Sequence, residues 1–125
     1  MMQVLLVEDS PILRESIKEM LSGCENVFVD EFAETQQDAI ALLDKKQYDM
    51  MIVDIELAEG NGFEVVKHTK EPDYLYNAPT AIMLTNHGNT YYKQLAKKCG
   101  VQYFFDKSMQ FEEAILTIEN ESKKG

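Results

Sequence analysis

Residues 4–11 have the sequence Val-Leu-Leu-Val-Glu-Asp-Ser-Pro, and this stretch decides the fold. Four consecutive apolar residues are typical of a strand whose two faces are both covered. The serine and proline are typical of a helix start, because serine caps the first turn and proline fits the first helical position. The stretch therefore predicts a buried strand, an acidic loop and a helix in immediate succession.

The same succession of a short apolar run and an amphipathic stretch recurs along the chain. Further apolar runs lie at residues 27–29, 50–53, 81–84 and 103–105. Apolar residues at helical spacing follow the five runs, within residues 13–21, 39–43, 62–68, 92–99 and 111–118. Five strand–helix units predict an α/β fold, with a doubly wound five-stranded parallel sheet of order 2-1-3-4-5 and five helices.

Composition narrows the classes of partner and compartment. The length of 125 residues predicts one domain over residues 1–125, and 12 Lys and Arg against 22 Asp and Glu give a formal net charge of −10. This acidity predicts no nucleic-acid partner and favours divalent cations or basic protein surfaces. The first apolar run is too short for a signal peptide or membrane span, and Cys24 and Cys99 are expected to be free thiols. We therefore expect a cytoplasmic protein without membrane contact.

Polar residues follow each apolar run, at the strand ends where parallel sheets bind ligands. In the predicted order the first and third strands are neighbours, so Glu8, Asp9 and Asp54 should share one crevice. An oxygen-only acidic cluster suits Mg²⁺, whereas this cluster lacks the soft ligands that zinc prefers. The residues after the five runs are Glu8-Asp9-Ser10, Asp30-Glu31, Asp54, Thr85-Asn86 and Asp106-Lys107.

Thr85 and Lys107 should place a hydroxyl and an ammonium group near the same crevice. Together with Mg²⁺, these groups would orient the oxygens of a phosphoryl group. Asp54 is the natural nucleophile, because it ends the central strand while Glu8 and Asp9 hold metal to one side. The expected product is an acyl phosphate. The nearby Gly60–Gly62 segment predicts a turn, since no lysine or serine of a phosphate loop follows it.

These residues, at their spacing and strand-end positions, resemble the receiver domain of bacterial two-component response regulators over residues 4–121. The resemblance implies a CheY-like, flavodoxin-like fold. It implies that a sensor histidine kinase, or a histidine phosphotransfer protein, donates a phosphoryl group from phosphohistidine. The matched residues are Glu8-Asp9, Asp54, Thr85 and Lys107.

The resemblance also implies a metal site. Asp9, Asp54 and the backbone carbonyl of Glu56 would be Mg²⁺ ligands, and Glu8 would act through water. Asp54 would be both ligand and phosphoryl acceptor.

A switch is implied by the resemblance as well. Thr85 would be the phosphoryl-sensing hydroxyl, Lys107 the phosphoryl-binding lysine and Phe104 the aromatic switch residue. Strand alternation should point the adjacent Tyr103 to the opposite face of the sheet. A register slip of one residue would instead make Tyr103 the switch.

The chain departs from the family pattern near the predicted site. Ser108 follows Lys107 where proline is common, so we expect a trans bond. Ala58 replaces another common proline, which should leave its loop looser. Glu56 and Asn86 stand where small or neutral residues are common, and we expect them to change the rate of dephosphorylation.

The expected function is a phosphorylatable switch with autophosphatase activity, not a multiple-turnover enzyme. It would signal to a downstream protein target through the fourth helix, fifth strand and fifth helix, with a phosphorylation-linked dimer as one option. A phosphorelay carrier is an alternative within the same class. An aspartate phosphatase of the haloacid dehalogenase type is a second alternative, although residues 54–56 read Asp-Ile-Glu and not Asp-x-Asp. A receiver-like module that is never phosphorylated is a third.

Overall fold

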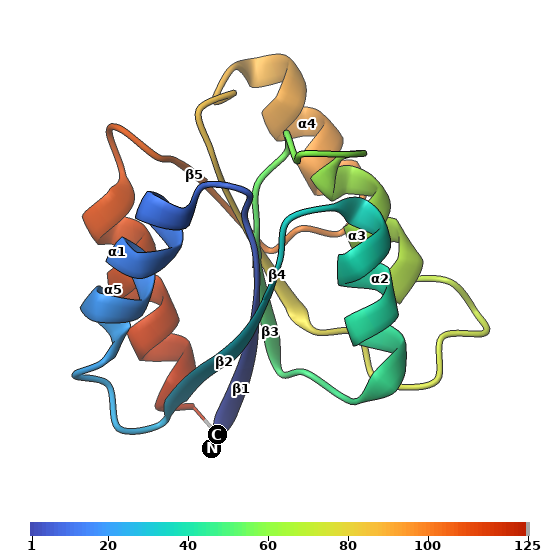
Figure 1. Ribbon diagram of the computed structural model, residues 1–125. Coiled ribbons are helices and arrows are strands. Elements are labelled where there is room, and N and C mark those ends of the chain that lie inside the picture. Colours follow the sequence, from blue (N-terminus) through green and yellow to red (C-terminus); the bar gives the residue numbers. More distant parts are fainter. Residues whose placement is uncertain (125) are drawn as a thin grey trace.

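Five parallel strands form one sheet with helices on both faces (Figure 1). The computed structural model describes residues 1–124. The sheet order β2-β1-β3-β4-β5 confirms the predicted topology. The strands are β1 (Met2–Val7), β2 (Val27–Ala33), β3 (Met50–Val53), β4 (Thr80–Thr85) and β5 (Tyr103–Asp106).

The helices are α1 (Pro11–Leu21), α2 (Gln36–Lys45), α3 (Gly62–Thr69), α4 (Thr90–Lys98) and α5 (Phe111–Ser122). Helices α1 and α5 cover one face of the sheet, and α2, α3 and α4 cover the other (Figure 1). Ser10 caps α1 and accepts a hydrogen bond from the Leu13 N–H, as the sequence predicted. Asn61 and Asn89 cap α3 and α4 in the same way, so side-chain acceptors define where these helices begin.

The central strands are buried on both faces. Leu5 and Val7 belong to the core under α2, α3 and α4, whereas Val4 and Leu6 belong to the core under α1 and α5. None of the four is more than 1% exposed. Burying a side chain of this size contributes about 1.5–3 kcal/mol. The two-sided core therefore holds the ends of β1 and β3 firmly in place.

Strand β2 is longer than the sequence predicted. Asp30 and Glu31 were expected to follow this strand, but it continues to Ala33, and both acids lie inside it. That prediction was wrong because β2 is an edge strand, so some of its side chains face solvent and charged residues fit within it. Glu31 accepts a hydrogen bond from the Tyr48 hydroxyl at 2.6 Å.

Cys24 and Cys99 are both free, as their distant positions predicted. Each side chain is only partly exposed. Among the helices of residues 1–124, none has the length and apolar character needed to cross a membrane.

The turn before α3 brings Gly62 against the end of β3. A Cβ at Gly62 would lie 2.1 Å from the carbonyl oxygen of Asp54 and 2.9 Å from Val53 Cγ2. Gly60 has a positive φ of 78°, which only glycine adopts easily. The chain bends at Gly60, within the predicted turn, and α3 begins at Gly62. Both positions leave no space for a Cβ, and Gly60 is needed for its positive φ as well.

We expect Gly62→Ala to lower the free energy of unfolding by about 1–3 kcal/mol, because the added methyl group must displace the backbone of Asp54. Urea denaturation measures the change. Gly23→Ala is the matched control, because a Cβ there meets nothing within 4 Å. Equal stability of the two variants would contradict the tight packing at Gly62.

Candidate functional site

Three carboxylates meet at the carboxyl ends of β1 and β3. Oxygens of Glu8, Asp9 and Asp54 all lie within 4.8 Å of one another. The two strands are neighbours with Val7 paired to Val53, so the residues that follow them emerge side by side. Glu8 is 3% exposed and Asp54 is 7% exposed. The structure thus brings together the three acids that were expected to share one crevice.

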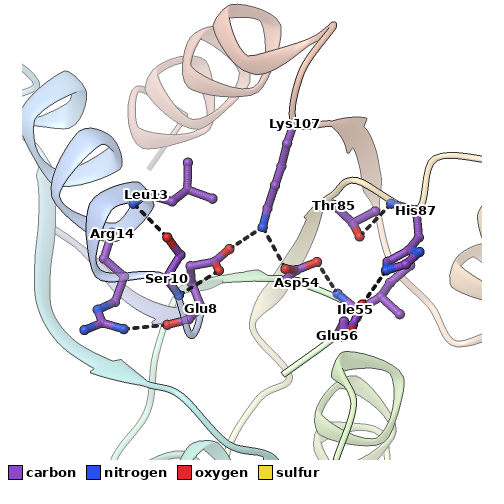
Figure 2. Close-up of polar contacts among 10 residues, drawn as sticks. All are labelled: Glu8, Ser10, Leu13, Arg14, Asp54, Ile55, Glu56, Thr85, His87 and Lys107. Atoms are coloured by element: carbon purple, nitrogen blue, oxygen red, sulfur yellow. Dashed lines mark hydrogen bonds and ion pairs between the residues drawn. The ribbon is translucent and has the colours of Figure 1, made fainter. Parts of the chain in front are cut away.

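Lys107 reaches into this acidic group from the loop after β5 (Figure 2). Its Nζ lies 2.7 Å from Asp54 Oδ2 and 2.8 Å from Glu8 Oε1. Burial opposes the charge of Lys107, but hydrogen bonds and attraction from both carboxylates outweigh it and raise the lysine pKa. Burial also raises the pKa of Glu8, and Lys107 works against that shift. The lysine therefore stays charged and bridges the two buried acids.

Thr85 is fully buried at the end of β4. Because Val53 pairs with Met83 on the neighbouring strand, Thr85 and Asp54 emerge at adjacent strand ends. Figure 2 shows Thr85 on the side of Asp54 away from Glu8. Its Oγ1 accepts a hydrogen bond from the His87 N–H at 3.1 Å, so the hydroxyl is tied to the loop that leads into α4.

The Glu56 side chain points away from the acidic group. It is 73% exposed, and its Oε2 lies 2.7 Å from His87 Nε2 (Figure 2). This pair joins the loop after β3 to the loop after β4, beside Asp54. Sequence reasoning missed it, because the two residues stand 31 positions apart and neither carries a recognisable spacing.

Phe104 faces the core under α4, and Tyr103 faces the core under α5. The opposite orientation predicted from strand alternation is confirmed. The Tyr103 hydroxyl donates a hydrogen bond to Glu121, a residue of α5, so the Tyr103 side chain is bonded to that helix. Phe104 is thus the aromatic residue of β5 that shares a core with α4.

The Lys107–Ser108 bond is trans, as expected, since none of the described peptide bonds is cis. The Asp106 carboxylate accepts hydrogen bonds from the N–H groups of Ser108 at 2.8 Å and Met109 at 3.0 Å. The Met109 and Ser108 bonds lower the pKa of Asp106. These bonds hold the loop that presents Lys107.

The loop with Ala58 is joined by a backbone hydrogen bond to the turn after β2, and its looseness relative to a loop with proline stays a prediction. The Ala58 N–H donates to the Glu34 carbonyl oxygen at 3.0 Å, a bond that proline could not form. A further residue missed at the sequence level is Arg14, whose Nη1 donates to the Glu8 carbonyl oxygen at 2.9 Å. A single arginine on an amphipathic helix gives no signal of such a contact.

Residues 4–119 match the family model of the response regulator receiver domain. The chain belongs to this family. It is therefore a phosphoacceptor receiver domain by class, and the haloacid dehalogenase alternative is not favoured.

Relatives and solved structures agree with this assignment. The sensory transduction protein LytT of Bacillus anthracis is 31% identical over 85 residues, which is 68% of this chain and 33% of LytT. The transcriptional regulatory protein DesR of Bacillus subtilis is 28% identical over 96% of this chain and 58% of DesR. The chain thus spans about one third of LytT. The HemR receiver domain of Leptospira biflexa shares 26% identity and a TM-score of 0.79, over 96% of this chain and 93% of that one.

The receiver family generally binds Mg²⁺ at an acidic pocket, and the residues here fit such an ion. Three carboxylates face one ammonium group, so the group carries an excess of negative charge. All the donors in the cluster are oxygen atoms, and a hard cation such as Mg²⁺ prefers oxygen.

We expect Asp9→Asn to raise the free energy of unfolding by about 1 kcal/mol without Mg²⁺, because it relieves repulsion and leaves both Lys107 ion pairs intact. Added Mg²⁺ should stabilise the native protein more than the variant. The difference between their free energies of unfolding should therefore become smaller. Thermal unfolding with and without Mg²⁺ measures both effects. Asp73→Asn, an exposed aspartate in the α3–β4 loop, is the control. If Asp9→Asn were less stable than the native protein without Mg²⁺, that result would contradict repulsion among the three carboxylates.

Proposed function

We propose that this chain accepts a phosphoryl group on Asp54 from a phosphohistidine of a sensor histidine kinase or a histidine phosphotransfer protein. The observation that carries the proposal is the position of Asp54. Its carboxylate is buried, touches the Lys107 ammonium at 2.7 Å and lies within 4.8 Å of two further carboxylates. The proposed nucleophile, a fixed cation and the acids that would hold a metal thus lie together at the carboxyl ends of β1 and β3.

The proposed step is an in-line transfer. A carboxylate oxygen of Asp54 attacks phosphorus, the phosphorus–nitrogen bond breaks, and the imidazole leaves with the electron pair. Lys107 neutralises the phosphoryl oxygens, because its ammonium is already fixed against the acceptor. Thr85 would offer its hydroxyl to a phosphoryl oxygen.

Asp9, Asp54 and the Glu56 carbonyl are the proposed ligands of Mg²⁺, with Glu8 acting through water. When bound, the ion would neutralise charge on the phosphoryl oxygens and the carboxylates.

The proposed switch begins at Thr85. A phosphoryl group that drew its hydroxyl away would cost the hydrogen bond to the His87 N–H and free the loop into α4. Phe104 could then pack more deeply, since it already contacts the core beneath α4. The output would pass through α4, β5 and α5 to a downstream protein target, or to a second copy in a phosphorylation-linked dimer.

Partner and compartment follow from the same proposal. The family implies contact with sensor kinases and downstream targets. The formal net charge of −10 supports protein partners and not nucleic acid for these residues. Free thiols and a histidine-kinase donor support a cytoplasmic setting. The phosphorelay carrier is the second candidate role, because the same acyl phosphate could pass to another histidine.

Incubation with Mg²⁺ and a small acyl-phosphate donor should add one phosphoryl group to the protein, measured by intact mass. The adduct should be labile in base, as an acyl phosphate is. Asp54→Asn should give no adduct, because an amide is a poor nucleophile. Labelling of Asp54→Asn, or no labelling of the native chain, would contradict the proposal.

Glu56 and Asn86 flank the pocket and are both exposed. Since the Glu56–His87 pair spans two loops beside Asp54, it supports the hypothesis that these positions set the lifetime of the acyl phosphate.

We expect Glu56→Ala to speed decay of the phosphorylated form by at least about threefold, or ~0.7 kcal/mol of barrier, because it breaks the Glu56–His87 pair between the two loops beside Asp54 and so lets water reach Asp54. Asn86→Ala should act in the same direction. The loss of the adduct over time by mass spectrometry gives the rates. Glu59→Ala, an exposed acid in the same loop, is the control. Unchanged decay in both test variants would refute the hypothesis.

A further inference from the structure

Arg14 projects from α1 towards the carboxyl end of β1 (Figure 2). Its Nη1 donates to the Glu8 carbonyl oxygen at 2.9 Å and to Glu34 Oε2 at 3.1 Å. The guanidinium carbon lies 3.9 Å from the centroid of the Phe32 ring, and the side chain is only 11% exposed. Two hydrogen bonds and a stacked ring therefore hold the planar guanidinium in one orientation.

Glu34 connects Arg14 to the loop that follows β3. Its carboxylate accepts the hydrogen bond from Arg14, and its backbone carbonyl accepts one from the Ala58 N–H at 3.0 Å. One residue of the β2–α2 turn is thus bonded to α1 through its side chain and to the β3–α3 loop through its backbone.

The first residue of α2, which follows this turn, makes further bonds to that loop. The Gln36 N–H donates to the Glu59 carbonyl oxygen at 2.9 Å, and Gln36 Oε1 accepts from the Asn61 N–H at 3.1 Å. Gly60 completes the contact, since a Cβ there would lie 2.3 Å from Gln36 Oε1. The β2–α2 turn and the start of α2 are thus bonded to the β3–α3 loop at several points. Arg14 adds a side-chain link from this turn to the end of β1, beside the backbone bond from the Glu8 N–H to the Ala33 carbonyl oxygen at 2.9 Å.

We propose that Arg14 and Glu34 form a clamp that acts together with the sheet bonds between β1 and β3 to set the spacing between the two halves of the acidic pocket. One half is Glu8 and Asp9 after β1, and the other is Asp54 with the loop after it. The inference rests on the proposed Mg²⁺-dependent function. Arg14 bonds to the backbone of Glu8 and not to the carboxylates of Glu8, Asp9 or Asp54, so Arg14 and Glu34 are positioning residues for the metal ligands.

A pure charge effect and a positioning role predict opposite changes in Mg²⁺ affinity when Arg14 is removed. A cation beside an acidic pocket repels Mg²⁺, so its removal should tighten metal binding if charge is all that matters. If Arg14 positions the ligands, its removal weakens binding, because carboxylates held at the wrong spacing coordinate poorly. The sign of the change therefore separates the clamp from a charge effect.

The experiment is titration calorimetry with MgCl₂ on the native chain, Arg14→Met, Glu34→Met and the double variant. We expect Arg14→Met to raise the Mg²⁺ Kd by about tenfold. Glu34→Met should raise it as well, and the double variant should be no worse than Arg14→Met, because both residues act through one connection. Lys18→Met is the control, since it removes an exposed cation from the same helix.

Arg14→Lys keeps the charge but loses the planar group that lies over the Phe32 ring, and it should bind Mg²⁺ more weakly than the native chain. Circular dichroism would show whether Arg14→Met folds. If it does not, Arg14→Lys replaces it as the test variant. Native-like or tighter binding by Arg14→Met, or native affinity in Arg14→Lys, would overturn the clamp alone. A native chain that binds no Mg²⁺ would overturn the proposed function first, and the clamp with it.

Discussion

The interaction on which the site depends is the contact of one buried ammonium group with two buried carboxylates. Lys107 lies 2.7 Å from Asp54 and 2.8 Å from Glu8, and all three side chains are nearly removed from water. Charges in such a place are costly unless they are paired. Lys107 pairs with two acids, and Asp9 adds a third negative charge to the group. The remaining negative charge is what makes this acidic group suitable for a cation.

The rest of the fold supplies the rigidity that this crowding requires. Strands β1 and β3 are covered by helices on both faces, and their apolar residues anchor the acids that follow them. Backbone contacts then refine the positions, as where Gly62 lies against the Asp54 carbonyl and where Asp106 holds the loop of Lys107. Repulsion among the acids is thus offset by apolar burial elsewhere in the same strands.

The elements and their order were predictable because each depends on local pattern. Apolar runs covered on both faces predict central strands, and the edge strand β2 was the exception, since its exposed side allows Asp30 inside the strand. The gathering of Glu8, Asp9 and Asp54 was also predictable, because the topology rule places the ends of neighbouring parallel strands together. The orientation of Phe104 followed from the two-residue repeat of a strand.

The sequence by itself determined which residues stand at the carboxyl ends of the strands other than β2, because apolar runs and helix caps are local signals. It therefore also determined which chemical groups stand at one edge of the sheet. Only the tertiary structure decided how those groups are paired and held. The Glu56–His87 pair, the bond from Ala58 to Glu34 and the position of Arg14 join residues far apart in the chain. Such contacts depend on how loops and helices pack in three dimensions, and no spacing along the chain records that packing.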